Sequence, residues 1–249
     1  MLTYAIGDIH GHLAKLEDLH GQIAADRVAH GAAGAPVIHV GDLVDRGPDS
    51  RGVIDFLLDG EARGENWIFL KGNHDRMFRG FLDDPDHHDR RLRTDLSWLH
   101  DRLGGAETLA SYGVRDAGAR LLQDLQAEAR EAVPAPHVAF LDRLQPYSLW
   151  GEVLFVHAGI RPGIDLRAQT EDDLLWIRRE FLEDTRDHGA LVVHGHTPVE
   201  AVTHYGNRLN IDTGAGYGDA LSAVAIDGAE VWQLTPRGRV RVPVPAVRG

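Results

Sequence analysis

Polar side chains that can bind metals recur at five points of the chain, each directly after a short apolar segment. The five phrases are GDIHG, GDLVDRGP, KGNHD, FVHAG and HGHTP. Imidazole, carboxylate and amide groups suit hard to borderline divalent ions. Such a set fits two divalent ions better than one, so we expect a dinuclear metal site. The candidate ligands are Asp8, His10, Asp42, Asn73, His157 and His196.

The spacing of the first ligands has a mechanical reason. Alternate residues of an extended segment point the same way, so Asp8 and His10 can hold one ion if the strand geometry continues. The two carboxylate oxygens of Asp42 suit it to bridge two ions. Two ions roughly 3.5–4 Å apart act on both oxygens of an in-line displacement, and water between them becomes hydroxide near neutral pH. The predicted chemistry is an in-line displacement by metal-bound water, without a side-chain nucleophile.

Each motif taken alone also has a structural explanation. An Asp after Gly at a strand end is common turn chemistry. A lone histidine on an apolar strand, such as His157, is more often part of the core than a ligand. The five motifs together, each at the end of a predicted strand, favour a site over five unrelated turns.

The motifs lie in the loops of a predicted α/β fold. Apolar strands at residues 2–6, 36–40 and 67–70 alternate with helices at 11–29 and 49–63. This alternation is typical of a largely parallel sheet. In open α/β sheets, ligands bind beyond the carboxyl ends of the strands, where these motifs lie.

The rest of the chain differs in pattern. Residues 82–136 are rich in Asp, Arg and His, and we interpret them as a helical, cap-like insertion, with ordinary crossover helices as the alternative. Within them we predict helices at 92–103, 106–112 and 119–131. A helix at 171–183 and an extended tail from Pro236 follow. A second, mostly antiparallel sheet is predicted from strands at 147–150, 153–157, 191–194, 199–205, 208–212, 221–226 and 231–234.

Composition excludes several classes of function. The chain has 249 residues, a net charge of −12 and no cysteine. Disulfides, thiolate metal sites and cysteine nucleophiles are therefore excluded. An acidic protein gains little from a long nucleic-acid backbone, so no extended footprint is expected. Without a signal-peptide pattern or about 18 consecutive apolar residues, we expect one cytoplasmic domain, residues 1–249, and no membrane partner.

The motifs GDIHG, GDLVDRGP, GNHD, VHAG and GHTP, in this order, resemble the signature of the phosphoprotein-phosphatase family of metallophosphoesterases. The resemblance runs from Asp8 to Gly214. It implies a calcineurin-like four-layer α/β/β/α sandwich with a helical insertion. It also implies two divalent ions, with manganese favoured and iron, zinc, nickel, cobalt or magnesium as alternatives.

The resemblance also implies a role for each matching position. His74 would be the general acid, with Asp45 or Asp75 as its carboxylate partner. Asp8, His10 and a bridging Asp42 would hold the first ion, and the second would be held by Asp42, Asn73, His157 and His196.

Arginines and one further histidine complete the implied site. Arg46 and Arg178 would bind phosphate oxygens, and Arg161 is a third candidate whose alternative is a surface arginine. His194 would lie outside the ligands, or would join them if the last motif is shifted by two residues.

These features lead to one expected function and several alternatives. We expect a serine/threonine protein phosphatase or broad phosphomonoesterase, acting on a phosphorylated protein or small phosphoester. The alternatives are a symmetrical dinucleoside-tetraphosphate hydrolase, a cyclic-nucleotide phosphodiesterase and a binding module without catalysis. The insertion bears on this choice, because its arginines could close over a nucleotide or form a salt-bridged outer face. They are Arg90, Arg91, Arg93 and Arg102.

Overall fold

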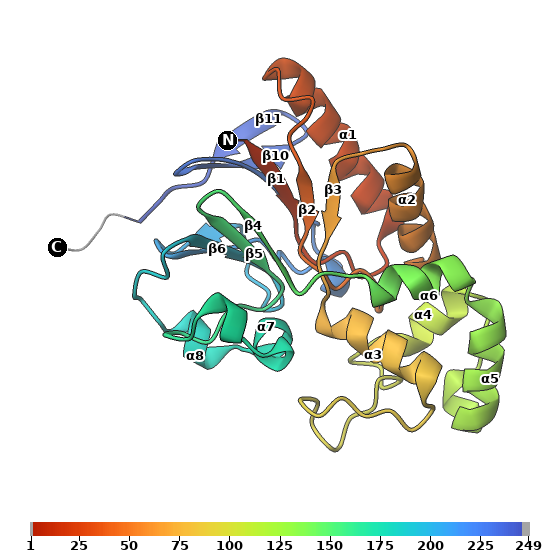
Figure 1. The fold of residues 1–249 in the computed structure, drawn as a ribbon. Helices are drawn as coiled ribbons and strands as arrows, with labels where there is room; N and C mark the ends of the chain where they lie inside the picture. Colours follow the sequence, from red (N-terminus) through yellow and green to blue (C-terminus); the bar gives the residue numbers. More distant parts are fainter. Residues whose placement is uncertain (1, 246–249) are drawn as a thin grey trace.

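The computed structural model describes residues 2–245 and contains two β-sheets packed face to face (Figure 1). The first sheet has the order β11-β10-β9-β1-β2-β3. Its strands β1 to β3 run parallel, as predicted, and β9 pairs antiparallel with β1. The strands are β1 (Thr3–Ile6), β2 (Val37–His39), β3 (Trp67–Phe69), β9 (Ala223–Asp227), β10 (Glu230–Thr235) and β11 (Gly238–Arg241).

The second sheet has the order β4-β5-β6-β8-β7 and is mixed. Strands β5, β6 and β8 are parallel, and the edge strands β4 and β7 are antiparallel to their neighbours. The prediction of a mostly antiparallel sheet was therefore wrong. The strands are β4 (Tyr147–Trp150), β5 (Val153–Val156), β6 (Leu191–His194), β7 (Thr203–His204) and β8 (Arg208–Asn210).

The predicted strands at 221–226 and 231–234 belong to the first sheet, not the second. Residues 223–226 are buried on both faces, which suits a strand inside a sheet covered on both sides. The order of strands along the sequence does not reveal that β9 pairs with β1. The predicted extended tail from Pro236 contains the edge strand β11, and the tail residues 246–249 lie outside the described part of the chain.

Helices cover the outer faces of both sheets, which confirms the four-layer sandwich (Figure 1). α1 (Leu13–Ala29) and α2 (Ser50–Ala62) pack on the first sheet. α7 (Glu171–Trp176) and α8 (Arg179–Leu182) pack on the second. A separate apolar core, which includes Phe155, fills the space between the sheets. The predicted helix at 171–183 is broken between α7 and α8.

A helical group lies at one end of the first sheet (Figure 1). It consists of α3 (Asn73–Asp83), α4 (Gly105–Ser111), a short 3-10 turn (Ala117–Ala119), α5 (Leu122–Ala132) and α6 (Ala135–Asp142). The helices predicted at 106–112 and 119–131 correspond to α4 and α5. The pattern analysis did not predict α3 or α6. No helix among residues 2–245 is long and apolar enough to cross a membrane.

The helix predicted at 92–103 was wrong, because residues 84–104 form an irregular loop. Leu92, Trp98 and Leu103 are buried, at spacings of six and five residues that no single helix face provides. Asp89 and Arg93 accept backbone bonds from residues three positions on, which closes separate turns. We call residues 84–104 the cap loop.

Removing Phe155 tests the core between the sheets. Phe155 is fully buried, so Phe155→Ala should lower the free energy of unfolding by about 3–5 kcal/mol through lost contacts and a residual cavity. Leu149→Ala, on the neighbouring strand and 55% exposed, is the control and should change it by roughly 0.5 kcal/mol or less. Urea denaturation of the metal-free protein measures both. Equal effects would contradict the assignment of this core.

Candidate dinuclear metal and phosphate site

The predicted site residues come from loops of both sheets and meet in one buried region. They follow β1, β2, β3, β5 and β6, so the two sheets jointly position them. Each is almost completely shielded from solvent, which removes the water that would otherwise compensate their charges. The exposed fractions are 2% for Asp8, 3% for His10, 2% for Asp42, 1% for Asn73, 0% for His157 and 6% for His196.

Asp42 lies between two groups of metal-binding atoms. Its Oδ2 is 3.5 Å from His10 Nε2, and its Oδ1 is 3.3 Å from His157 Nε2. His10, Asp42 and His74 offer ligand atoms within 4.8 Å of one another, and so do Asp42, His157 and His196. One carboxylate oxygen thus faces each group, which is the arrangement that a bridging ligand needs.

Two of the histidines have the hydrogen bonds of metal ligands. His10 Nδ1 is 2.9 Å from the Val44 carbonyl, and His157 Nδ1 is 3.0 Å from the Val40 carbonyl. A backbone carbonyl accepts a hydrogen bond only from Nδ1–H, so in the neutral ring it is Nε2 that carries the lone pair for an ion. Metal-binding histidines are commonly oriented in this way. Nε2 of each ring faces Asp42, so the residues fit a bound ion.

Asp8 provides an independent sign that a cation belongs here. Its Oδ2 accepts the backbone N–H of His196 at 2.9 Å, but its buried Oδ1 has no partner among residues 2–245. An unpaired buried carboxylate oxygen is costly unless a cation lies near it. Burial and the neighbouring Asp212 also raise the pKa of Asp8 well above its usual value. Asp8 is not within the two close histidine groups, although it lies beside them.

The backbone at the site is unusual. Five of the six non-glycine residues with positive φ in the described chain belong to it, the sixth being Asp116. Side chains disfavour this left-handed region, and such strain clusters at functional sites. The strand ends therefore turn sharply toward the site, and the extended geometry assumed through His10 does not continue. The five φ values are 47° for His10, 49° for Asp42, 74° for Asp45, 67° for Arg46 and 66° for His196.

The structure pairs His74 with Asp45 and not with Asp75. His74 Nδ1 is 2.7 Å from Asp45 Oδ2. Asp75 instead accepts backbone N–H groups of Leu43 and Gly72 at 2.9 and 2.8 Å, at the start of α3. Burial raises the pKa of Asp45, and burial lowers that of His74 to about 3, with Asp42 opposing the second shift. Both shifts have the same cause, since burial disfavours the charged form of each group.

The cap loop and α4 orient this pair. Trp98 Nε1–H donates to Asp45 Oδ2 at 2.8 Å, and the Thr108 hydroxyl donates to Asp45 Oδ1 at 2.7 Å. With His74, these bonds occupy both carboxylate oxygens and fix the plane of the carboxylate. Sequence reasoning did not single out this role for either residue, because both lie far along the chain from Asp45.

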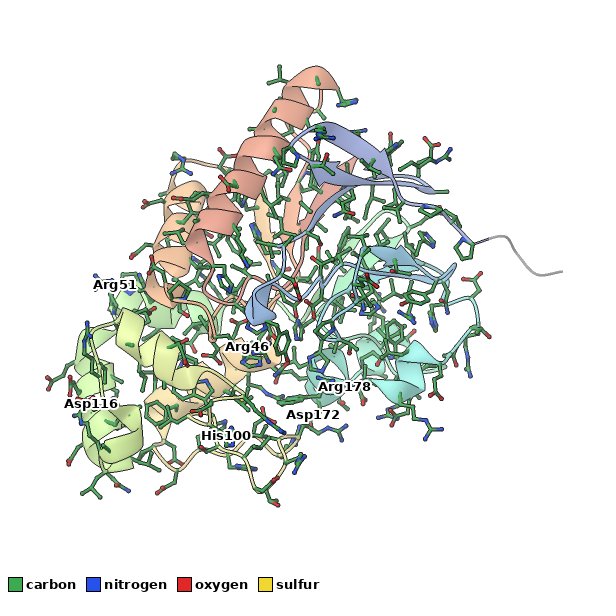
Figure 2. The ribbon with its side chains drawn as sticks, turned by 180° about the vertical axis from the view of Figure 1, so that it is seen from behind. Arg46, Arg51, His100, Asp116, Asp172 and Arg178 are labelled. Atoms are coloured by element: carbon green, nitrogen blue, oxygen red, sulfur yellow. The ribbon has the colours of Figure 1, made fainter. Side chains whose placement is uncertain are left out.

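Two of the three candidate arginines face the site. Arg46 donates to Nε2 of His10 at 2.8 Å and of His74 at 3.0 Å, while Arg178 Nε donates to His196 Nε2 at 3.1 Å. Figure 2 shows Arg46 and Arg178 reaching the region from different halves of the molecule. Arg161 does not, since it forms a paired contact with Asp173 at 2.5 and 3.1 Å.

His194 also lies apart from the ligand groups. Its Nε2 is 3.2 Å from an Arg208 nitrogen, and its Nδ1 bonds to the Gly195 carbonyl. These contacts favour the first alternative, in which His194 supports the motif from outside.

A pocket of about 310 Å³ opens over Asp42, Asn73, His74 and His196. The sequence analysis raised the arginines of the cap loop as groups that could close over a nucleotide, but it placed no residue of α7 or of the 212–219 loop in the pocket. The clustering of arginines in the cap loop was visible in the sequence, whereas nothing in the sequence indicated that Tyr217 lines the pocket. The further lining residues are Arg46, Arg91, Leu92, Arg93, Leu96, Arg102, Leu103, Trp176, Arg178 and Tyr217.

The Trp98 bond predicts an effect on catalysis at a distance. Trp98→Phe keeps a ring against Phe78 and Phe81 but removes the donor to Asp45. A hydrogen bond to a charged group contributes roughly 1.5–3 kcal/mol, so kcat should fall about 10- to 100-fold and the acidic limb of its pH profile should shift. Steady-state kinetics over pH 5–9 measure this. An unchanged kcat and pH profile in the folded variant would contradict the role.

Metal binding should depend on pH through His157. Burial opposes its charge, but the carboxylate of Asp42 raises the pKa of His157 to about 9 in the metal-free protein. A ligand histidine must be neutral, so an ion competes with this proton below pH 9. The apparent affinity for Mn²⁺ should therefore rise from pH 6 to pH 9, with proton release on binding at pH 7. Calorimetry in buffers of different ionisation enthalpy measures both, and a pH-independent affinity would contradict the assignment.

Comparison with known proteins assigns the chain to a family. A model of the calcineurin-like phosphoesterases matches residues 1–224. The asymmetrical bis(5'-nucleosyl)-tetraphosphatase PrpE of Anoxybacillus flavithermus is 28% identical and covers 90% of both chains. The protein of the same name from Bacillus subtilis is 26% identical and covers 87% of both.

Solved structures show the same fold. One described as a candidate diadenosine tetraphosphatase has a TM-score of 0.62 at 21% identity and covers 97% of this chain and 94% of its own. A cold-active protein-tyrosine phosphatase from Shewanella has a TM-score of 0.60 at 17% identity, covering 97% and 80%. The family uses a dinuclear divalent metal centre, which agrees with the two groups that share Asp42. The chain belongs to the calcineurin-like phosphoesterase family and is a metal-dependent phosphoester hydrolase.

Proposed function

We propose that the protein hydrolyses dinucleoside tetraphosphates with the help of two divalent ions, manganese being the favoured metal. One observation carries the proposal: five arginines and a single carboxylate, that of Asp42, line the pocket over the site. The whole chain has a net charge of −12, so the positive charge of this pocket is opposite in sign to that of the chain. A chain of several phosphates matches it better than a single phosphate does. The names of the relatives support the same substrate.

The proposed ligands follow the two groups around Asp42. Asp8, His10 and Asp42 would hold one ion, and the other would be held by Asp42, Asn73, His157 and His196. Asn73 Oδ1 is 3.0 Å from His157 Nε2, so the amide oxygen faces the second group. Two bound divalent ions supply a nucleophile from water near neutral pH and neutralise phosphoryl charge.

Arg46 and Arg178 would bind the oxygens of the phosphate under attack. A guanidinium offers a planar pair of donors that matches two phosphate oxygens. Arg46 packs against the Tyr217 ring, whose centre lies 4.6 Å from the guanidinium carbon, and this contact does not use the histidine atoms assigned to an ion or to the proton. Its orientation is therefore fixed before substrate arrives, which lowers the entropic cost of binding.

His74 would donate the proton that the leaving oxygen needs. Its Nδ1 is bound to Asp45, so Nε2 is the ring nitrogen left to carry this proton; in this structure Nε2 instead accepts a hydrogen bond from Arg46. A phosphate leaving group has a pKa of roughly 6 and needs this proton less than an alkoxide does. The contribution of His74 should thus depend on the substrate.

The position of cleavage determines the products. Attack at an end phosphorus expels a nucleoside triphosphate and leaves a monophosphate, whereas attack at a central phosphorus with a nucleoside diphosphate as the leaving group gives two diphosphates. We propose the first, asymmetrical outcome because the relatives carry that name. The sequence motifs had suggested the symmetrical form as the alternative to a protein phosphatase. The Shewanella phosphatase adds no support for phosphoprotein hydrolysis, because 17% identity shows the fold alone.

A substrate panel with Mn²⁺ tests the proposal. Diadenosine tetraphosphate should be turned over in preference to p-nitrophenyl phosphate and to phosphoserine peptides, with ATP and AMP as products. Asp42→Asn should abolish turnover of all three. His74→Asn should lower phosphoserine hydrolysis by about 10²–10⁴-fold and dinucleotide hydrolysis by less. Asp59→Asn, an exposed change on α2, is the control and should match the wild type.

Other outcomes would change the conclusion. Preference for phosphopeptides would return the assignment to a protein phosphatase with the same site. Absence of any metal-dependent turnover would contradict an enzymatic role.

A further inference from the structure

The cap loop contributes three arginines to the wall of the pocket. Arg91, Arg93 and Arg102 line the same space as Asp42 and His74. Figure 2 shows the cap loop, marked by His100, on the same side of the molecule as Arg46 and Arg178. The pocket therefore contains guanidinium groups beyond the two assigned to the phosphate under attack.

These arginines differ in their partners. Arg93 is paired with Asp95 at 2.6 Å, and Arg90, outside the pocket, is paired with Asp172 at 2.6 Å. The guanidinium groups of Arg91 and Arg102 have no ion pair and no hydrogen bond among residues 2–245. Only their backbone N–H groups donate, to Asp89 and His100. The guanidinium donors of both are thus available to an anion in the pocket.

The acidic side chains near Arg91 are already bound. The carboxylate of Asp173 accepts hydrogen bonds from Arg161 and Thr170. Asp172 accepts from Arg76 at 2.9 Å and from Arg90 at 2.6 Å. Neither carboxylate is free to neutralise Arg91 fully, so the positive charge persists at this end of the pocket.

The cap loop holds its arginines on a fixed framework. Leu92, Trp98 and Leu103 are 9%, 4% and 6% exposed and anchor the loop in the core. Arg76 of α3 bonds both oxygens of Asp89 at 2.8 and 3.0 Å. Anchored on both sides of Arg91, the loop presents its cations at a set position relative to His74. Such preorganisation favours binding.

We propose that Arg91 and Arg102 form a second anion-binding subsite, which takes the phosphates beyond the one under attack. The inference rests on the proposed function only in that the substrate is a phosphate chain. In an asymmetrical cleavage the leaving part carries three phosphates, and these must be bound somewhere outside the catalytic position. The subsite would make the enzyme select chains of phosphates over single phosphate esters.

Inhibition by two inorganic anions tests the subsite without a nucleotide. Orthophosphate and tripolyphosphate compete with p-nitrophenyl phosphate at a fixed free Mn²⁺ concentration, and the ratio of their inhibition constants is the readout. Arg91→Ala/Arg102→Ala should reduce the preference for tripolyphosphate about tenfold or more, the effect of losing charged hydrogen bonds. Arg115→Ala/Arg130→Ala, exposed and unpaired arginines of the same helical group, is the matched control and should retain the preference.

A charge-retaining variant guards against a structural explanation. Arg91→Lys/Arg102→Lys should recover part of the preference, and thermal unfolding should show all variants folded. An unchanged ratio in the alanine variant, or no preference for tripolyphosphate in the wild type, would overturn the subsite. A lowered ratio in a protein that does not hydrolyse diadenosine tetraphosphate would support the subsite and contradict the proposed function. Hydrolysis of the dinucleotide with an unchanged ratio would support the proposed function and contradict the subsite.

Discussion

The carboxylate of Asp42, held between two groups of buried histidines, is the interaction on which the site depends. Each of its oxygens faces a different imidazole, at 3.5 and 3.3 Å. Buried carboxyl groups of Asp8 and Asp45 lie around it, and burial raises the pKa of both because charge is disfavoured where water is excluded. Such charge is costly without cations. The shared position of Asp42 and the unpaired oxygen of Asp8 are both explained by two divalent ions.

The buried carboxylates also restrict which residues can occupy the neighbouring loops, because the loop backbone lies very close to them. A side chain at Gly72 would place its Cβ 2.1 Å from Asp42 Oδ1, and one at Gly195 would lie 1.9 Å from Asp8 Oδ1. The glycines of GNHD and GHTP are therefore needed so that loops of both sheets can approach the carboxylates. These loops contain residues with strained positive φ angles. The packing of the two sheets around Phe155 compensates the energetic cost of that strain. The cap loop joins the same assembly through Trp98.

The gathering of the candidate ligands and the parallel strands of the first sheet could be predicted because local signals agree: each apolar run ends at a motif, and strand ends meet at one edge of a sheet. What failed depends on contacts distant in sequence. Asp45 and Asp75 flank His74 with similar chemistry, and only the folded chain selects Asp45. Arg161 forms an ion pair with Asp173 and therefore does not face the site. The cap loop looked helical because its apolar residues recur, but their burial follows tertiary anchoring and not helical spacing.

The pocket combines the candidate metal ligands with five arginines, and under the proposed function these arginines would select among phosphoesters. The account nevertheless depends most on the bridging role of Asp42. Anomalous diffraction from crystals soaked in Mn²⁺ tests that role most directly. We predict two peaks about 3.5–4 Å apart, one on each side of the Asp42 carboxylate. A single peak, or two peaks that do not share Asp42, would contradict the account.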